Sequence, residues 1–325
     1  MSAPFPYFGG KKSVARDVWD ALGNVKHYIE PFFGSGAVLL ARPHNLEGKL
    51  ETICDKDGFV ANVWRSLQHD PDEVARWCDW PVNHADLNAR RKRLLENEQR
   101  LLENLAEDDR WFDPLLAGYW IWAASCWIGS GLTRPGAKPH LSNTGMGVHK
   151  LSKRPHVAHA GKGVHKLGQR PHLGCAGKGV QDPYNTNIYN WFRELSERLR
   201  YVRVVCGDWT RVCGGNWQDN MGTCGIFFDP PYAAEDRDQG IYHQDSRSVA
   251  NEVRAWALAR GDRESYRIVI AEYDEHDVLE QYGWICKRWV TNGGYGKLGQ
   301  GMENRNRETL WFSPHCINSQ PNLFD

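Results

Sequence analysis

Two short motifs far apart in the chain combine residue types that can serve one reaction. Residues 229–232 read Asp-Pro-Pro-Tyr and follow residues 225–228, an apolar run typical of a buried strand. An acidic residue at the strand's end, two prolines and an aromatic ring form a rigid ledge. This ledge presents a carboxylate, a backbone carbonyl and a ring to one planar ligand.

The second motif, Glu-Pro-Phe-Phe-Gly-Ser-Gly at residues 30–36, is typical of a nucleotide-binding turn. Residues 28–32 are predicted to form a strand that runs into a Gly-x-Gly turn and a helix. Without side chains, the glycines let a cofactor approach the backbone at the strand's carboxyl end. A second strand at 51–54 ends in Asp55, where a carboxylate can bind ribose hydroxyls.

In this order, the two motifs resemble the Dam-type (class alpha, D12) N6-adenine DNA methyltransferases, and the resemblance extends over most of the chain. It implies an α/β, Rossmann-like, seven-stranded AdoMet-dependent methyltransferase sheet whose last strand is antiparallel. Seven segments of the chain are predicted to be strands: 28–32, 51–54, 202–206, 226–229, 267–271, 284–290 and 309–312.

The resemblance also implies a mechanism. The N6 amine of adenine is a poor nucleophile because its lone pair is conjugated into the ring. The Asp229 carboxylate and the Pro230 carbonyl would each accept a hydrogen bond from one N–H of this amine. The carboxylate would also stabilise the positive charge that develops on the nitrogen, while Tyr232 would stack on the adenine ring. A base inside a duplex cannot reach this ledge and must be flipped out.

Further positions follow from the resemblance alone. The N-terminal string 6–11 would pack against the methionine end of S-adenosyl-L-methionine (AdoMet), and residues 303–312 resemble the family's closing strand. The implied cofactor residues are Tyr7 near the sulfonium, Lys11 at the carboxylate, Pro31, Phe33, Gly34 and Gly36 in the turn, Asp55 at the ribose, and Asp208 with Trp209 at the adenine.

A long insertion is expected to interrupt the α/β pattern. Residues 1–69 and 201–325 are predicted to form the AdoMet-binding catalytic domain, and residues 70–200 an inserted target-recognition region. A long helix there would be capped by Asp86, and residues 115–129 would form a buried helix. The string 127–134 departs from the family's aromatic-Asn-Gly-Leu-x-Arg pattern, so no recognition sequence can be transferred.

A basic, repetitive segment lies within this insertion, although the whole chain has no net charge. Between Asp113 and Asp182 there is no acidic residue, and a Pro-His unit recurs three times at 139–180. A segment of this length that carries only positive charges favours contact with DNA phosphates. The expected DNA-binding residues are Arg134, Lys138, Lys150, Lys153, Arg154, Lys162, Lys166, Arg170 and Lys178. Because bidentate base readers are few, we hypothesise relaxed sequence preference, as in some prophage-encoded relatives.

Other features exclude or suggest further roles. His156, His159, His172 and Cys175 lack the tight pairs of a zinc module, so no metal is expected. The nine cysteines include no Cys-x-x-Cys pair, and no signal peptide or membrane span is recognised, which favours the cytoplasm of a bacterial host. The tail from Gln320 to Phe324 resembles the peptide that docks on the bacterial sliding clamp.

Three alternatives to adenine methylation of DNA stay open. N4-cytosine methyltransferases more often carry Ser in place of Asp229. Methylation of RNA or protein is a more distant possibility. A DNA-binding module that has kept the fold and lost catalysis is the rival from another class.

Overall fold

The computed structural model describes residues 1–7, 10–43, 46–127, 132–133, 188–231, 242–273, 278–289 and 308–317. They divide into two compact units. Unit 1 comprises Met1–Gly10, Gly34–Leu40 and Asp55–Gly207, and unit 2 comprises Lys11–Phe33, Ala41–Cys54 and Asp208–Asp325.

A mixed sheet has the strand order β3-β2-β1-β4-β5-β7-β6. Strand β1 pairs in parallel with β2 and β4, β4 pairs in parallel with β5, and β7 runs antiparallel between β5 and β6. The expected seven-stranded α/β sheet with an antiparallel last strand is therefore confirmed. The strands are β1 (His27–Glu30), β2 (Leu50–Asp55), β3 (Val202–Cys206), β4 (Cys224–Phe228), β5 (Tyr266–Tyr273), β6 (Ile285–Arg288) and β7 (Glu308–Phe312).

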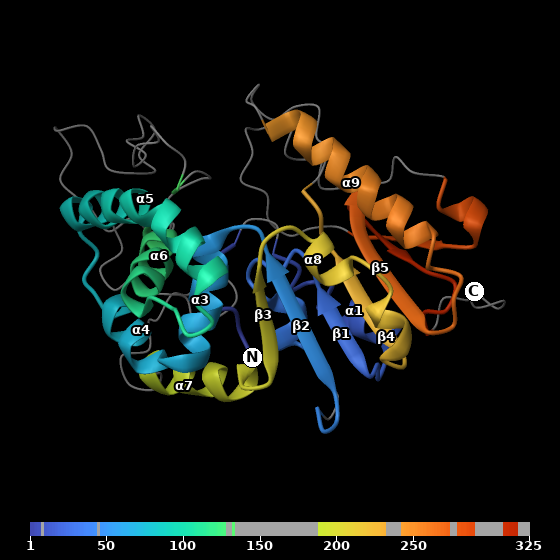
Figure 1. The fold of residues 1–325 in the computed structure, drawn as a ribbon, viewed down its shortest axis with the longest axis horizontal. Coiled ribbons are helices and arrows are strands. Elements are labelled where there is room, and N and C mark those ends of the chain that lie inside the picture. The colour runs from blue at the N-terminus through green and yellow to red at the C-terminus, as the bar shows by residue number, and fades with distance from the viewer. Residues whose placement is uncertain are drawn as a thin grey trace. The chain divides into compact units, whose positions relative to one another are not determined.

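Helices of unit 1 gather into one bundle, in which α3, α4 and α5 all pack on α6, and α7 packs on α3 and α4 (Figure 1). Helix α6 is apolar on all sides, and nine of its thirteen residues are buried. This confirms the buried helix expected at 115–129, although it ends earlier. The helices of unit 1 are α2 (Ala37–Leu40), α3 (Gly58–His69), α4 (Pro71–Cys78), α5 (His84–Glu107), α6 (Pro114–Cys126) and α7 (Ile188–Leu199).

Polar side chains cap the N-termini of these helices by accepting hydrogen bonds from free backbone N–H groups of the first turn. Asp57, Asp70 and Asp113 cap α3, α4 and α6 in this way. The expectation that Asp86 caps the long helix α5 is wrong. The cap is Asn83, which accepts from the N–H of Ala85, because the helix already begins at His84 and Asp86 lies within its first turn.

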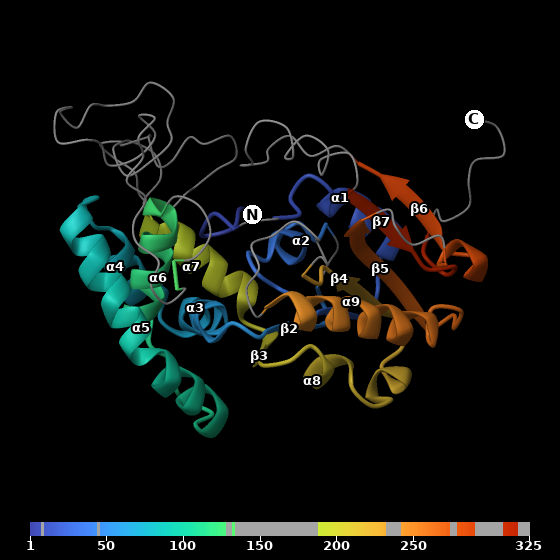
Figure 2. The same cartoon turned by 90° about the horizontal axis from the view of Figure 1, so that it is seen from above.

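Unit 2 places helices on both faces of its strands. Trp19 of α1 (Ala15–Leu22) packs on Tyr28 of β1, whereas Trp256 of α9 (Tyr242–Leu258) packs on Phe228 and Tyr266. In the parallel register Tyr28 aligns with Gly225, so Phe228, three residues further on, faces the opposite side. The two helices accordingly cover opposite faces (Figure 2).

Short helical turns complete unit 2: α8 (Thr210–Cys213), η1 (Trp217–Asn220) and η2 (Glu280–Tyr282). Strand β4, which leads to the Asp-Pro-Pro-Tyr motif, is buried at all five positions. Over the described ranges, no helix has both the length and the apolar character needed to cross a bilayer.

Candidate active-site residues

The predicted Gly-x-Gly turn lies in unit 1 directly after β1. Gly34 and Gly36 both have positive φ, +49° and +65°. L-residues with side chains rarely adopt this conformation, which explains why the turn carries glycine. A Cβ atom on Gly34 would also lie 2.6 Å from the Tyr7 ring, so this residue has no room for a side chain.

Asp55 and Trp64 hold this turn in place. The N–H of Gly34 donates to Asp55 Oδ2 at 2.8 Å, and Trp64 Nε1 donates to the Gly34 carbonyl at 2.9 Å. Phe5 packs against the rings of both Tyr7 and Trp64. We call Tyr7, Gly34, Asp55 and Trp64 the glycine-turn cluster. The sequence gives no signal for Trp64, since it contributes from the middle of α3.

The two acidic residues after β2 have different roles. Asp57 caps α3 by accepting from the N–H of Phe59 at 2.8 Å. Asp55 instead accepts from Gly34 and from the N–H of Asp57. Burial and the neighbouring Asp57 raise the pKa of Asp55 to about 7, against the lowering effect of these N–H groups. Asp55 is thus the acidic residue that touches the glycine turn.

The remaining predicted turn residues are buried. Phe33 is 3% exposed, and its N–H donates to the Cys54 carbonyl at 3.0 Å. Pro31 is buried as well. Gly36 accepts from the N–H of Leu40 and so starts helix α2. Pro31 and Phe33 are therefore core residues, whereas Tyr7 is 42% exposed.

Asp229 lies in unit 2, one residue beyond the buried strand β4. Its side chain is 22% exposed, and its Oδ1 lies 2.9 Å from Nζ of Lys11, which is only 6% exposed. Pro230 is buried and Pro231 is exposed, as expected for a ledge anchored on one side. Tyr232 lies outside the described residues. We call Lys11, Asp229 and Pro230 the Asp229 cluster.

Aromatic rings line the end of β4 in unit 2. Phe228 contacts the rings of Phe32, Trp209 and Trp256. Trp209 is 4% exposed, and its Nε1 is buried without a hydrogen-bond partner among the described residues. A buried N–H without a partner is costly and suits a ligand acceptor.

One carboxylate oxygen of Asp208 is already engaged in hydrogen bonds to a nearby residue. Its Oδ1 accepts from both the backbone N–H and the hydroxyl of Thr210, at 3.0 and 2.7 Å. Asp208 is half-buried, and these bonds leave its second carboxylate oxygen, Oδ2, as a further acceptor. Asp208 can therefore offer this oxygen to the amine of a nucleobase while it keeps its bonds to Thr210.

These residues fit AdoMet by their chemistry. The glycine turn has no space for side chains, Asp55 is a carboxylate of the kind that binds ribose hydroxyls, and Trp209 carries an unpartnered N–H. The exposed Tyr7 ring can face a sulfonium cation. Among the described residues no group of three or more His, Cys, Asp and Glu side chains could hold a metal ion.

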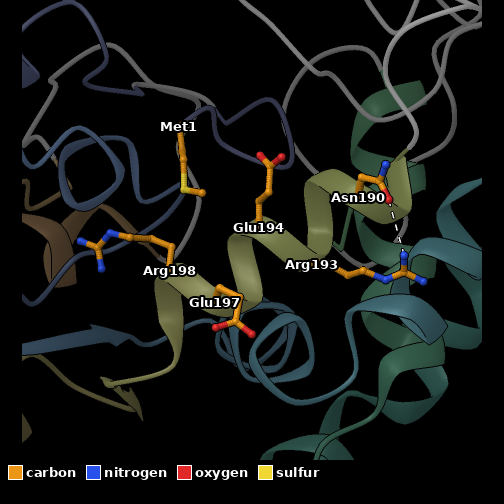
Figure 3. A pocket seen from close by; sticks show the side chains of 6 residues that line it. All are labelled: Met1, Asn190, Arg193, Glu194, Glu197 and Arg198. Atoms are coloured by element: carbon orange, nitrogen blue, oxygen red, sulfur yellow. Dashed lines mark hydrogen bonds between the residues drawn. The ribbon is translucent and has the colours of Figure 1, made fainter.

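One surface pocket in unit 1 is lined by none of these residues. It has a volume of about 640 Å³ and is lined by Met1 and side chains along α7 (Figure 3). The lining mixes two arginines with two glutamates and contains none of the predicted site residues. We assign it no role.

Several predicted contacts fall on parts of the chain that the structure does not describe. They include all nine basic residues expected on DNA, the repeat at 139–180, the four candidate zinc ligands and the tail from Gln320 to Phe324. These assignments stay predictions.

A comparison with models of protein families finds a match for part of the chain. The family model for the D12 class N6 adenine-specific DNA methyltransferases matches residues 7–126, which include Tyr7, Lys11, the glycine turn and Asp55. Asp208 and Asp229 lie beyond the matched residues. None of the curated proteins matches the chain. Residues 7–126 of this chain are thus similar to the D12 class N6 adenine-specific DNA methyltransferases, and the seven-stranded sheet agrees with the fold expected of such an enzyme.

Proposed function

We propose that the chain transfers the methyl group of AdoMet to the N6 amine of a flipped adenine in DNA. The observation that carries this proposal is Asp229, a partly exposed carboxylate at the end of a fully buried strand, followed by a buried proline. The D12 family match supports adenine in DNA as the substrate and AdoMet as the cofactor.

In this proposal the catalytic residues act by orientation and electrostatics. Asp229 and the Pro230 carbonyl each accept a hydrogen bond from one N–H of the N6 amine. These two bonds orient the amine so that its lone pair is no longer conjugated with the ring. The carboxylate then stabilises the positive charge that develops on the nitrogen. Tyr232 stacks on the adenine ring. When bound, AdoMet supplies an electrophilic methyl group.

Cofactor-binding roles are assigned to single residues through the family resemblance. Asp55 accepts hydrogen bonds from the ribose hydroxyls, Tyr7 faces the sulfonium, and the glycine turn allows close approach of the backbone. Asp208 and Trp209 bind the cofactor's adenine. Lys11 binds the methionine carboxylate.

DNA contacts are assigned to the inserted region 70–200, and chiefly to its basic repeat at 139–180. Residues 1–69 and 201–325 would supply the catalytic domain. We also propose that the enzyme has a relaxed preference for the DNA sequence around the adenine and that it acts in the cytoplasm. Mapping methylated adenines on a plasmid by long-read sequencing tests the first, because a single strict motif of four to six bases would refute it.

The decisive experiment incubates the purified protein with AdoMet and DNA and quantifies modified bases by mass spectrometry. N6-methyladenine is the expected product. Methylcytosine alone would make the chain an N4-cytosine enzyme, and methylation of RNA in place of DNA would change the substrate class. A protein that binds DNA but no AdoMet would be a non-catalytic module.

A further inference from the structure

The aromatic contacts around the glycine-turn cluster point to a role for Phe5, one that rests on the proposed function. We infer that Phe5 is a positioning residue: it holds the Tyr7 ring in the orientation in which the face of that ring can meet the sulfonium of AdoMet. Phe5 does not touch the cofactor in this proposal and acts only through Tyr7. Phe5 and the rings that it contacts all lie in unit 1.

The first observation is the central place of Phe5 among three aromatic rings. Phe5 is buried, at 2% exposed. Its ring centroid lies 4.8 Å from that of Trp120 in α6 and 5.8 Å from that of Trp64 in α3. It also lies 6.0 Å from the ring centroid of Tyr7. Phe5 therefore packs on two helices of the bundle and connects them with Tyr7.

The second observation is that these contacts depend on ring orientation. Phe5 meets Trp120 edge to face, with an angle of 86° between the ring planes, and it meets Tyr7 at 66°. Aromatic rings attract one another in such arrangements because the positive edge of one ring lies against the negative face of the other. A ring at position 5 that is fixed by Trp120 therefore favours one orientation of the Tyr7 ring.

The third observation is that Tyr7 lies against the glycine turn and is still accessible. A Cβ atom on Gly34 would lie 2.6 Å from the Tyr7 ring, so this ring packs directly on the backbone of the turn. Tyr7 is nevertheless 42% exposed. Exposed side chains change rotamer rapidly unless their neighbours restrict them. Phe5 supplies such a restriction, whereas Gly34 has no side chain with which to hold the ring.

The orientation of Tyr7 bears directly on the choice of ligand. A cation is attracted to the face of an aromatic ring, where the quadrupole is negative, and not to its edge. The sulfonium of AdoMet is such a cation, whereas S-adenosylhomocysteine, which remains after methyl transfer, has a neutral sulfur. A Tyr7 ring that presents its face should thus favour AdoMet over S-adenosylhomocysteine, and loss of the Phe5 ring should weaken this preference.

The test measures the affinities for both ligands by isothermal titration calorimetry without DNA. The proteins are wild type, Phe5→Leu, Tyr7→Leu and the double variant, each checked for a cooperative thermal transition. Phe192→Leu is the matched control, because Phe192 is a fully buried ring of α7 that packs on Trp191, outside the glycine-turn cluster. If Phe5→Leu does not fold, Phe5→Met with Phe192→Met takes its place, since the flexible Met side chain adapts to irregular space.

We expect Phe5→Leu to lower the preference for AdoMet over S-adenosylhomocysteine by about two- to five-fold, the range of a cation–π contact at an exposed site. Tyr7→Leu should lower this preference at least as much, the double variant no further, and Phe192→Leu should keep it.

Three results would overturn the role of Phe5: a preference that either single variant leaves unchanged, losses that add in the double variant, or an equal loss in Phe192→Leu. The last of these would show a general effect of core packing. Wild-type protein that binds neither ligand would instead remove the proposed function, and the role of Phe5 with it.

Discussion

At the residue scale, the structure separates carboxylates that look alike in the sequence. Asp57 caps a helix, Asp55 holds the glycine turn, and Asp229 pairs with Lys11. Each environment sets what the group can do. The Asp57 carboxylate accepts a backbone N–H of its helix, whereas the Asp229 side chain is 22% exposed and can be reached by a substrate.

Replacement of Asp229 should affect catalysis and stability differently, depending on the substitution. Asp229→Asn keeps the shape and a hydrogen-bond acceptor but loses the charge, so methylation should fall at least about 100-fold. Asp229→Ala also leaves the Lys11 ammonium without this partner. It should lower the free energy of unfolding by about 1–3 kcal/mol, less than for a fully buried pair.

Urea denaturation and a methylation assay measure the two effects. The double variant Lys11→Met/Asp229→Ala is the matched control, and it should recover part of the lost stability because the buried ammonium charge is removed together with the carboxylate. Near-normal methylation by Asp229→Asn would contradict the ledge mechanism.

A second residue-scale prediction concerns pH and Asp55. Its pKa of about 7 lies above the ordinary value of 3.8, so the folded protein binds this proton more tightly than the unfolded chain. The stability that Asp55 contributes is therefore present below about pH 4 and is lost as pH rises to about 7. Compared with Asp55→Asn, the wild type should lose more stability between pH 4 and 7.

Cofactor affinity should change in the opposite direction with pH. Ribose hydroxyls donate best to an ionised carboxylate, so S-adenosylhomocysteine should bind more tightly as pH rises through about 7. Asp55→Asn should bind weakly at every pH. If titrations at pH 6 and pH 8 give equal affinities for the wild type, Asp55 does not bind the ribose.

At the element scale, the turn after β1 depends on its backbone conformation and on the α3 side chain that fixes it. Gly34 has φ +49°, its carbonyl is held by Trp64, and its N–H is held by Asp55. The turn is thus rigid before any ligand arrives. Rigidity of this kind lowers the entropic cost of binding.

Gly34→Ala should damage both the turn and cofactor binding. The left-handed conformation costs about 1–2 kcal/mol for alanine, and the new Cβ would lie 2.6 Å from the Tyr7 ring. Gly48→Ala is the matched control, because Gly48 also has positive φ, +64°, but nothing lies within 4 Å of its Cβ position.

Thermal denaturation and calorimetry separate the two glycines. Both variants should lose similar backbone stability, but only Gly34→Ala should also lose affinity for S-adenosylhomocysteine, by about ten-fold or more. Equal affinities in the two variants would show that close backbone approach at Gly34 is not needed.

At the scale of the whole molecule, the charge distribution is the main guide to DNA binding. The chain has 40 basic and 40 acidic residues, yet the stretch between Asp113 and Asp182 contains no acidic one. Contacts with phosphates release counterions, so binding through this stretch should depend steeply on salt.

Replacement of Lys150, Lys153, Arg154, Lys166 and Arg170 by Gln should flatten that dependence. Each lost phosphate contact reduces the slope of log affinity against log salt by about 0.9 on duplex DNA. AdoMet affinity should not change. A variant that keeps its salt slope would move the DNA contacts to another part of the insertion, with the helices at 86–129 as the next candidates.

Features that have a local cause could be predicted from the amino-acid sequence. Strand β4 was predictable because a continuous apolar run favours a buried strand, and the turn because two glycines adopt conformations closed to other residues. Seven strand segments and the antiparallel last strand also followed, the latter through the family resemblance.

The contacts between side chains that are distant in the sequence could not be predicted and follow from the packing of the fold. Lys11 pairs with Asp229, and Trp64 bonds to Gly34. Hydrophobic periodicity specifies the face that an element buries but not the neighbour against which it packs. Ion pairs and single hydrogen bonds depend on that packing to within an ångström, which is why the partner of Lys11 could not be read from the sequence.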